Sequence, residues 1–258
     1  MGYAKAGENG AAPYPEAVAA PETVPLASLV SRLGKFSAVE SGDTLRSLVR
    51  GRRGYDRDTP AWAERGDLAS IVVIESGWAY KFAIMHDGRR HIADFFGPGA
   101  ICNWPRLSRF EEQDDILFKG GASVTLLEPG LLDEKLNEDA SLASTIKRHE
   151  LARAMRTTQR IRAFISLPAM ERTLLLLLDF ADELRTVGKA PDWIHLPFAQ
   201  AELADMLGLT AVHVSRVFKK LVDTGIIERD GNSVRFTDRR RIERDLAYRR
   251  FFQARRSP

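Results

Sequence analysis

The sequence predicts an α+β protein with an N-terminal antiparallel β-roll of the jelly-roll type, then a long helix, then a C-terminal winged helix-turn-helix. Three observations carry this prediction. Short β-rich runs separated by glycines fill residues 50–129, which is typical of an antiparallel roll or barrel. Glycine is then absent from residues 131–187, where apolar residues recur at helical spacing. Finally, residues 200–219 contain two short amphipathic stretches separated by Gly208.

The chain begins with a tail and two short helices. Its first 25 residues are rich in Ala, Pro, Gly and Glu and lack hydrophobic periodicity, so we expect a disordered tail. Leu26–Leu33 and Gly42–Val49 each predict a short helix. The chain is thus expected to divide into a tail (1–25), the roll (26–130), the long helix (131–167) and the winged helix-turn-helix domain (168–258).

Three runs in the roll region predict strands, at residues 70–75, 78–84 and 91–96. Asp87 and Gly88 lie between the last two runs. Because an Asp-Gly pair adopts the backbone of a tight turn at low cost, this spacing predicts a β-hairpin.

A helical stretch runs from Leu131 to about Ser166, and Pro168 ends it. A further helix is predicted over Met170–Val187. The apolar positions of the long stretch do not form a clean heptad, so their spacing alone does not establish a coiled-coil seam between two copies. These positions are Leu142, Ile146, Leu151, Met155, Ile161 and Ile165.

The helix-turn-helix is predicted from side-chain spacing and turn chemistry. Val214, Val217, Phe218 and Leu221 give the second helix one buried face. Gly208 allows the sharp turn, and the Thr210 hydroxyl is expected to cap the second helix. Ala199 stands where a capping Ser or Thr would begin the first helix, a loss of about 1 kcal/mol if nothing replaces it.

Two short strands follow, at residues 226–229 and 233–236, around the turn Asp230-Gly231-Asn232. Helix, turn, helix and β-wing together predict a winged helix, for which DNA binding is the favoured interpretation. An ordinary pair of core helices, or a degenerate winged helix used for protein contacts, stays open. A basic amphipathic helix, or a frayed one, is expected over Asp238–Phe252.

Charge is unevenly placed along the chain, although its net charge is only +3. Residues 199–258 carry 13 Lys and Arg against 8 Asp and Glu, and residues 141–167 carry 6 against 1. Residues 111–140 carry 2 against 9. This distribution predicts a polyanionic partner for one end of the protein only.

Composition also predicts the cellular context. The single cysteine, Cys102, excludes an intrachain disulfide and fits a reducing cytosol. No stretch has the pattern of a signal peptide or a membrane span, so we expect a cytoplasmic protein without membrane contact. No P-loop, dinucleotide fingerprint, metal-spaced cluster or activated nucleophile is recognisable, and we expect no enzymatic activity.

Two groups of motifs carry a family resemblance. One is Glu75-Ser76-Gly77-Trp78-Ala79 with Asp87-Gly88-Arg89-Arg90 and Pro98-Gly99, and the other is Ala204–Arg216. With the order of elements, they resemble the Crp/Fnr superfamily of bacterial transcription regulators over about residues 26–245. The resemblance implies an effector-binding roll, a dimerisation helix at 131–167, and a homodimer on palindromic double-stranded DNA that contacts RNA polymerase.

The resemblance also implies roles for individual residues. Arg216 falls on the family's base-reading arginine, and Ser215 on the serine beside it in the Fnr branch. A guanidinium is suited to this role because it can engage guanine O6 and N7 together. Val212 replaces a common glutamate, and with His213 it is expected to modulate the base choice. The phosphate contacts are expected from Gln200, Thr210, Lys219, Lys220, Arg229 and Arg235.

The effector signatures of the family are missing. Cyclic-nucleotide members use a Gly-Glu pair and an Arg-Ser pair, whereas residues 100–104 lack the glutamate and residues 111–115 are acidic. An acidic loop would repel a cyclic phosphate, so cyclic nucleotide binding is not expected. One cysteine cannot hold the four-cysteine iron–sulfur cluster of the Fnr kind.

No cofactor is therefore expected, and no metal. Haem stays open as a less favoured possibility, with His86, His91, Cys102 or His149 as axial ligand. The alternative function is a haem or small-molecule sensor that acts through protein contacts at the acidic surface Glu111–Asp115. A roll that has lost its ligand altogether fits the same sequence.

Overall fold

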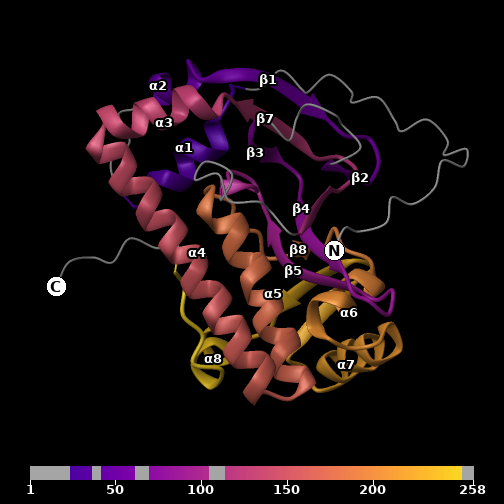
Figure 1. Cartoon of the computed structure of the whole chain (residues 1–258). Coiled ribbons are helices and arrows are strands. Elements are labelled where there is room, and N and C mark those ends of the chain that lie inside the picture. Colours follow the sequence, from indigo (N-terminus) through magenta and orange to yellow (C-terminus); the bar gives the residue numbers. More distant parts are fainter. Residues whose placement is uncertain (1–23, 37–41, 62–69, 105–113, 252–258) are drawn as a thin grey trace, which may run out of the picture.

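In the computed structural model of the protein, residues 24–36, 42–61, 70–104 and 114–251 are described. Figure 1 shows the β-roll at one end, the helix-turn-helix unit at the other, and the long helix α4 running along one side of both. The predicted α+β architecture is confirmed. The predicted tail lies outside the described residues, except for Val24 and Pro25.

The roll consists of two antiparallel sheets. The first has the strand order β1 (Val49–Gly54), β7 (Ser123–Leu127), β3 (Ile71–Ser76). The second has the order β2 (Thr59–Pro60), β6 (Asp115–Phe118), β4 (Ala79–Ile84), β5 (Arg90–Phe96). The predicted hairpin joins β4 to β5: Gly88 has a φ of 82°, and the Asp87 carboxylate accepts the Arg89 backbone N–H at 3.0 Å.

Strand β3 is buried on both faces, which explains its unbroken apolar run. Val72 and Ile74 face the interior between the two sheets. Ile71 and Val73 belong to a second core beneath the flanking helices. A cavity of about 10 Å³ lies in this interior among the described residues, beside Tyr55.

The first four helices differ from their predicted bounds in two places. Helix α1 (Ala27–Leu33) is as expected, but α2 (Gly42–Arg46) ends early because residues from Val49 join β1. The long helix is two helices, α3 (Pro129–Glu138) and α4 (Ala140–Ser166). They are separated by Asp139, whose backbone is extended and whose carboxylate caps α4 by accepting the Leu142 N–H at 2.9 Å. An Asp favours such a cap over a helix interior.

The C-terminal unit is a helix-turn-helix with a wing. Its elements are α5 (Ala169–Thr186), β8 (Ile194–His195), α6 (Gln200–Leu207), α7 (Ala211–Asp223), β9 (Ile227–Asp230), β10 (Ser233–Phe236) and α8 (Arg239–Asp245). The wing has a third strand that was not predicted, since β8 pairs with β10. Helix α8 is shorter than predicted and ends near Ala247, which has a φ of 48°.

This unit packs directly on the roll. One aromatic cluster joins Trp78 and Phe95 of the roll to Phe180 and Phe198 of the C-terminal unit. The Phe95 and Phe180 ring centroids are 4.3 Å apart, and those of Trp78 and Phe198 are 5.9 Å apart. Helix α6 lies against β5, so the roll and the helix-turn-helix share one continuous core.

Candidate nucleic-acid interface

Helix α7 has one buried and one exposed face, as its spacing predicts. Val214 and Leu221 are fully buried, and Phe218 is nearly so. The opposite face lies in solvent, and even the apolar Val212 is 62% exposed on it. The exposed residues are Val212, His213, Ser215, Arg216, Lys219 and Lys220. The four predicted base-reading residues thus lie on one accessible helix face.

The turn before α7 has the expected chemistry. Gly208 has a φ of 62°, where an L-residue would be strained. The Thr210 hydroxyl oxygen accepts the His213 backbone N–H at 3.2 Å and caps α7. At the start of α6, the Glu202 carboxylate accepts the Ala199 N–H at 2.8 Å. Half of a capping box therefore remains, and it offsets part of the stability loss caused by the missing side-chain cap at Ala199.

Three of the predicted phosphate contacts are engaged within the protein. Lys219 Nζ lies 2.8 Å from the Asp223 carboxylate. Arg235 pairs with Glu228 and covers the Trp193 ring at 5.0 Å. The third residue is Arg229, which donates to the Gly231 carbonyl at 3.0 Å and lies 4.9 Å from the centroid of the Phe218 ring.

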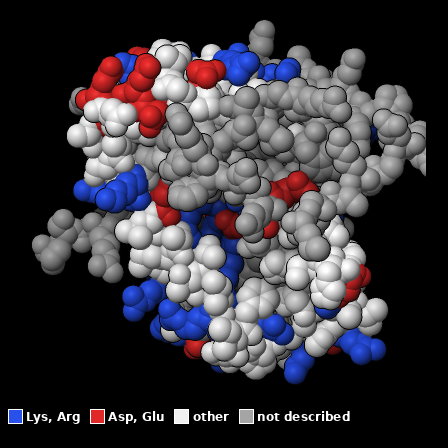
Figure 2. All heavy atoms as spheres, viewed as in Figure 1, with Lys and Arg blue, Asp and Glu red and all other residues white. Residues whose placement is uncertain are grey.

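Arg216 and Lys220 differ from these three residues. Both side chains are exposed, and neither makes a hydrogen bond or an ion pair with a described residue. Gln200 is half-buried at the first turn of α6, and Thr210 is exposed at the start of α7. Figure 2 shows Lys and Arg side chains along the lower margin of the molecule, where α7 and α8 lie in Figure 1.

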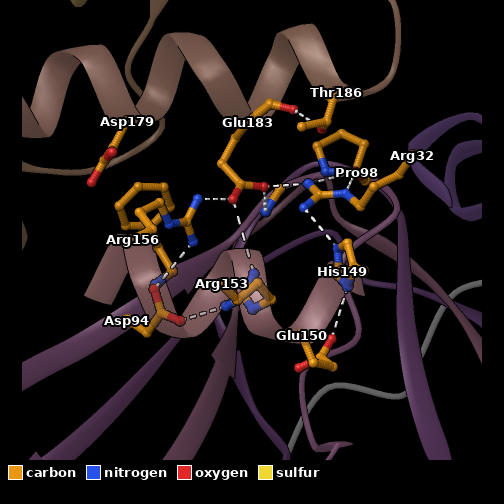
Figure 3. Close-up of polar contacts among 12 residues, drawn as sticks. Arg32, Asp94, Pro98, His149, Glu150, Arg153, Arg156, Asp179, Glu183 and Thr186 are labelled. Carbon is orange, nitrogen blue, oxygen red and sulfur yellow. Dashed lines mark hydrogen bonds and ion pairs between the residues drawn. The ribbon is translucent and has the colours of Figure 1, made fainter. Parts of the chain in front are cut away.

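Part of the basic character of residues 141–167 serves the interior of the protein. Three of its arginines, Arg153, Arg156 and Arg160, point inward and are largely buried (Figure 3 shows the first two). All three pair with the carboxylate of Asp94 on β5, Arg160 at 2.7 Å. Three of the six basic residues of this stretch are therefore paired inside the protein, whereas Lys147, Arg148 and Arg162 are exposed.

Glu183 of α5 is a second centre of this buried network (Figure 3). Its carboxylate is fully buried and pairs with Arg32 of α1 and Arg156 of α4. It also accepts the Gly97 backbone N–H at 3.3 Å. Burial alone would raise the pKa of Glu183, but the guanidinium groups of Arg156 and Arg32 outweigh it and hold the pKa well below its usual range. The same balance holds the pKa of Asp94 low.

Sequence reasoning missed this network, although a signal was present. Residues 153, 156 and 160 follow the i, i+3, i+7 spacing of one helix face. Three arginines on one face predict a common acidic partner. The identity of that partner is not local, since Asp94 and Glu183 lie on other elements.

The haem candidates lie in unlike surroundings. His86 and His91 are exposed, whereas Cys102 and His149 are buried. His149 Nε2 is 3.5 Å from Arg32 Nη1, and its Nδ1 is 2.8 Å from the Glu150 carboxylate. Burial lowers the pKa of His149, despite its contact with Glu150. Among the described residues, no three His, Cys, Asp or Glu side chains gather as metal ligands.

The acidic surface of the alternative function lies mostly outside the described residues, which include only Asp114 and Asp115 of it. Burial and the neighbouring Asp114 raise the pKa of Asp115. No described helix combines the length and apolarity that a membrane span needs.

Comparisons with known proteins agree with this architecture. Residues 171–245 match the family of Crp-like helix-turn-helix domains. Transcriptional activator protein FnrA of Stutzerimonas stutzeri is 22% identical over 200 residues, which cover 76% of this chain and 80% of FnrA. Nitrogen fixation regulation protein FixK of Bradyrhizobium diazoefficiens is 24% identical over 194 residues, covering 75% of this chain and 81% of FixK. The structure of FixK2 from Bradyrhizobium japonicum has a TM-score of 0.63 and 23% identity, over 76% of this chain and 97% of FixK2. Residues 171–245 therefore form a Crp-like helix-turn-helix domain, and the chain is similar over about three quarters of its length to transcription regulators of the Crp/Fnr superfamily.

Proposed function

We propose that this regulator binds a palindromic DNA site in a sequence-specific manner as a homodimer, with α7 as the recognition helix. The observation that carries the proposal is the exposed face of α7, where Arg216 makes no hydrogen bond or ion pair with a described residue. A recognition helix must be rigid as well as exposed. The buried face of α7 and the caps at Thr210 and Gly208 supply that rigidity.

The exposed side chains suit the major groove. The Arg216 guanidinium would engage guanine O6 and N7 together, and the Ser215 hydroxyl would bond a neighbouring base edge. Val212 would contact a thymine methyl group, with His213 beside it. Lys220 and Gln200, whose side chains make no hydrogen bond or ion pair with a described residue, would bind phosphates, and the Thr210 hydroxyl, which accepts from His213, would donate to one. By contrast, Lys219, Arg229 and Arg235 would exchange their contacts with Asp223, Gly231 and Glu228 for phosphates.

A second exposed face supports the homodimer. On α4, Leu151 is 59% exposed, Met155 is 43% exposed and Ile165 is 81% exposed. With Thr158 and Arg162 these residues follow a 4-3-4-3 spacing, which is one seam of a two-helix coiled coil. A second copy of the chain would cover this stripe. The two recognition helices would then lie about 34 Å apart, in successive major grooves.

The dimer is tested by light scattering of the purified protein and its variants. Leu151→Glu with Ile165→Glu should give a monomer, because both charges would be buried in the seam. Ile161→Glu is a matched control, since Ile161 is a 54% exposed apolar residue of α4 that lies off this stripe. A wild-type monomer, or equal dissociation by both substitutions, would refute the seam.

DNA binding is tested by selecting genomic fragments with the effector-free protein at two salt concentrations. We expect one enriched palindrome. Arg216→Ala should then cost about 1–3 kcal/mol on that site and relax the preference at one base pair per half-site. Lys220→Ala should weaken specific and random DNA alike and reduce the salt slope. Equal loss on both DNAs for Arg216→Ala would contradict base reading by this residue.

A further inference from the structure

A cavity of about 260 Å³ lies where the roll meets the helix-turn-helix unit. It is lined by β5, the second half of α4, the start of α5 and the end of α6. Its walls are mostly apolar, with Ile92, Leu176 and Met206 among them. Ile161 and Phe164 also line it and are 54% and 38% exposed, so the cavity opens to solvent beside α4.

Two arginines that line this cavity each have one buried side-chain nitrogen without a hydrogen-bond partner among the described residues. Nη2 of Arg160 is buried and without a partner, although its other nitrogens bond Asp94 and Asp179. Nε of Arg172 is also buried and unbonded. Arg172 makes no ion pair in the described part of the chain, and its guanidinium group lies 5.6 Å from the centroid of the Phe164 ring. Figure 2 shows basic atoms in a hollow between the α4 side and the α6 side of the molecule.

Buried donors without partners are unfavourable, and an anion that accepts from them removes the penalty. The other ionisable groups that line the cavity do not neutralise Arg172, so a ligand with one negative charge would balance its positive charge. The Asp94 carboxylate is already shared by three arginines, and His91 is exposed at the edge of β5. A doubly charged phosphate ester would need more donors than these two groups offer. A carboxylate can accept from two guanidinium groups at once.

The cavity volume limits the size of the apolar part of the ligand that accompanies the carboxylate. An apolar cavity of about 150 Å³ holds one benzene molecule, so 260 Å³ accommodates a ring or chain of somewhat greater size. We propose that this junction cavity is a small-molecule site that takes a monocarboxylate with an apolar body, such as a medium-chain alkanoate or an arylalkanoate. Arg172 and Arg160 hold the carboxylate, and the walls from β5, α5 and α6 hold the apolar body.

The location gives the site a consequence for regulation, which rests on the proposed DNA-binding function. Helix α6 contributes Met206 and Leu207 to the cavity, and it is fastened to the roll beside it. Arg90 Nε lies 2.8 Å from the Asp205 carboxylate, and Lys119 Nζ lies 2.9 Å from that of Glu202. A ligand between β5 and α6 therefore acts on the contact that positions the helix-turn-helix against the roll.

The binding test uses calorimetric titration of the full-length protein with octanoate and with 3-phenylpropionate, in the absence of DNA. Octan-1-ol and octylamine have similar apolar bodies without the carboxylate. Arg172→Gln removes the free guanidinium, and Thr157→Trp fills the cavity from α4. Arg185→Gln is the matched control, because Arg185 is a half-buried arginine of the same helix without an ion pair among the described residues and does not line the cavity.

We expect saturable binding of at least one acid, with one site per chain. Arg172→Gln should weaken it about 10-fold to 100-fold, which is the effect of one lost charge-assisted hydrogen bond. Thr157→Trp should abolish binding, and Arg185→Gln should leave it unchanged. The proposal is overturned if neither acid saturates, if the alcohol binds as well as octanoate, or if Arg172→Gln and Thr157→Trp bind like the wild type. DNA selection without ligand is a separate measurement, so failure here leaves the proposed DNA binding untouched.

Discussion

Replacing Glu183 by glutamine tests the buried charge network most directly. The substitution keeps the size of the side chain, so it opens no cavity. It removes the negative charge that faces Arg32 and Arg156, whose side chains are 0% and 2% exposed. Removing one partner of a buried ion pair costs about 3–5 kcal/mol, because the remaining charge stays in a medium of low polarity. Since a whole domain is stable by only about 5–15 kcal/mol, Glu183→Gln should lower the free energy of unfolding by a large fraction.

The assay is urea unfolding at one fixed protein concentration, followed by tryptophan fluorescence and by far-ultraviolet circular dichroism. Coincident transitions would justify a two-state fit, and the free energies of unfolding then give the difference. Glu138→Gln is the control, because Glu138 pairs with Lys135 on the surface of α3 and should change the free energy by less than about 0.5 kcal/mol.

The double variant Arg32→Met with Glu183→Met separates the charge from the packing. Apolar residues of similar size often replace a buried pair at little cost, and Arg156 would still pair with Asp94. We therefore expect the double variant to lose less stability than Glu183→Gln alone, a coupling that a double-mutant cycle measures. A loss below about 1 kcal/mol for Glu183→Gln would refute the reasoning, since it would mean that water reaches the two guanidinium groups.

Two further predictions concern pH and backbone conformation. Burial puts the pKa of His149 below its unfolded value of about 6.5, so the unfolded chain binds the extra proton and the free energy of unfolding should fall as pH drops from 7.5 to 5.5. His149→Gln should flatten that part of the profile, and an unchanged slope would contradict the assignment. Gly99→Ala should cost more than about 2 kcal/mol, because φ is 76° and a Cβ would lie 2.3 Å from the Ser28 carbonyl oxygen. Gly88→Ala has a similar φ of 82° but meets no atom within 4 Å, so it should cost only about 1 kcal/mol in urea unfolding, and equal losses would rule out the close contact.

Much of the helix-turn-helix could be predicted because its signals are local. The buried positions of α7 repeat at helical spacing, and Gly208 and Thr210 supply turn and cap within a few residues of them. The same holds for the hairpin at Asp87-Gly88. Exposure of Arg216 also follows from spacing, since a residue opposite Val214 and Val217 on a packed helix faces water.

Other features depended on partners far along the chain. Strand β8 has two residues and exists because β10 is available to pair with it. The break at Asp139 was hidden because both flanking segments are helical, and one side-chain cap separates them. Spacing alone also could not divide the apolar residues of α4 into core and surface. Ile146 is buried beneath the roll, while Leu151 lies in solvent.

The sequence by itself determined that this chain carries an amphipathic helix with one exposed face in a winged helix-turn-helix, because amphipathic spacing and turn chemistry act over short distances. Only the tertiary structure decided the role of the charges on α4. Whether an arginine faces water or is buried depends on which carboxylates the fold brings to it, since an unpaired buried charge is too costly to persist. Asp94 of β5 and Glu183 of α5 meet Arg153 and Arg156 only once the roll and α5 pack against α4. Arg153, Arg156 and Arg160 of α4 therefore join α4 to strand β5 of the roll and to helix α5.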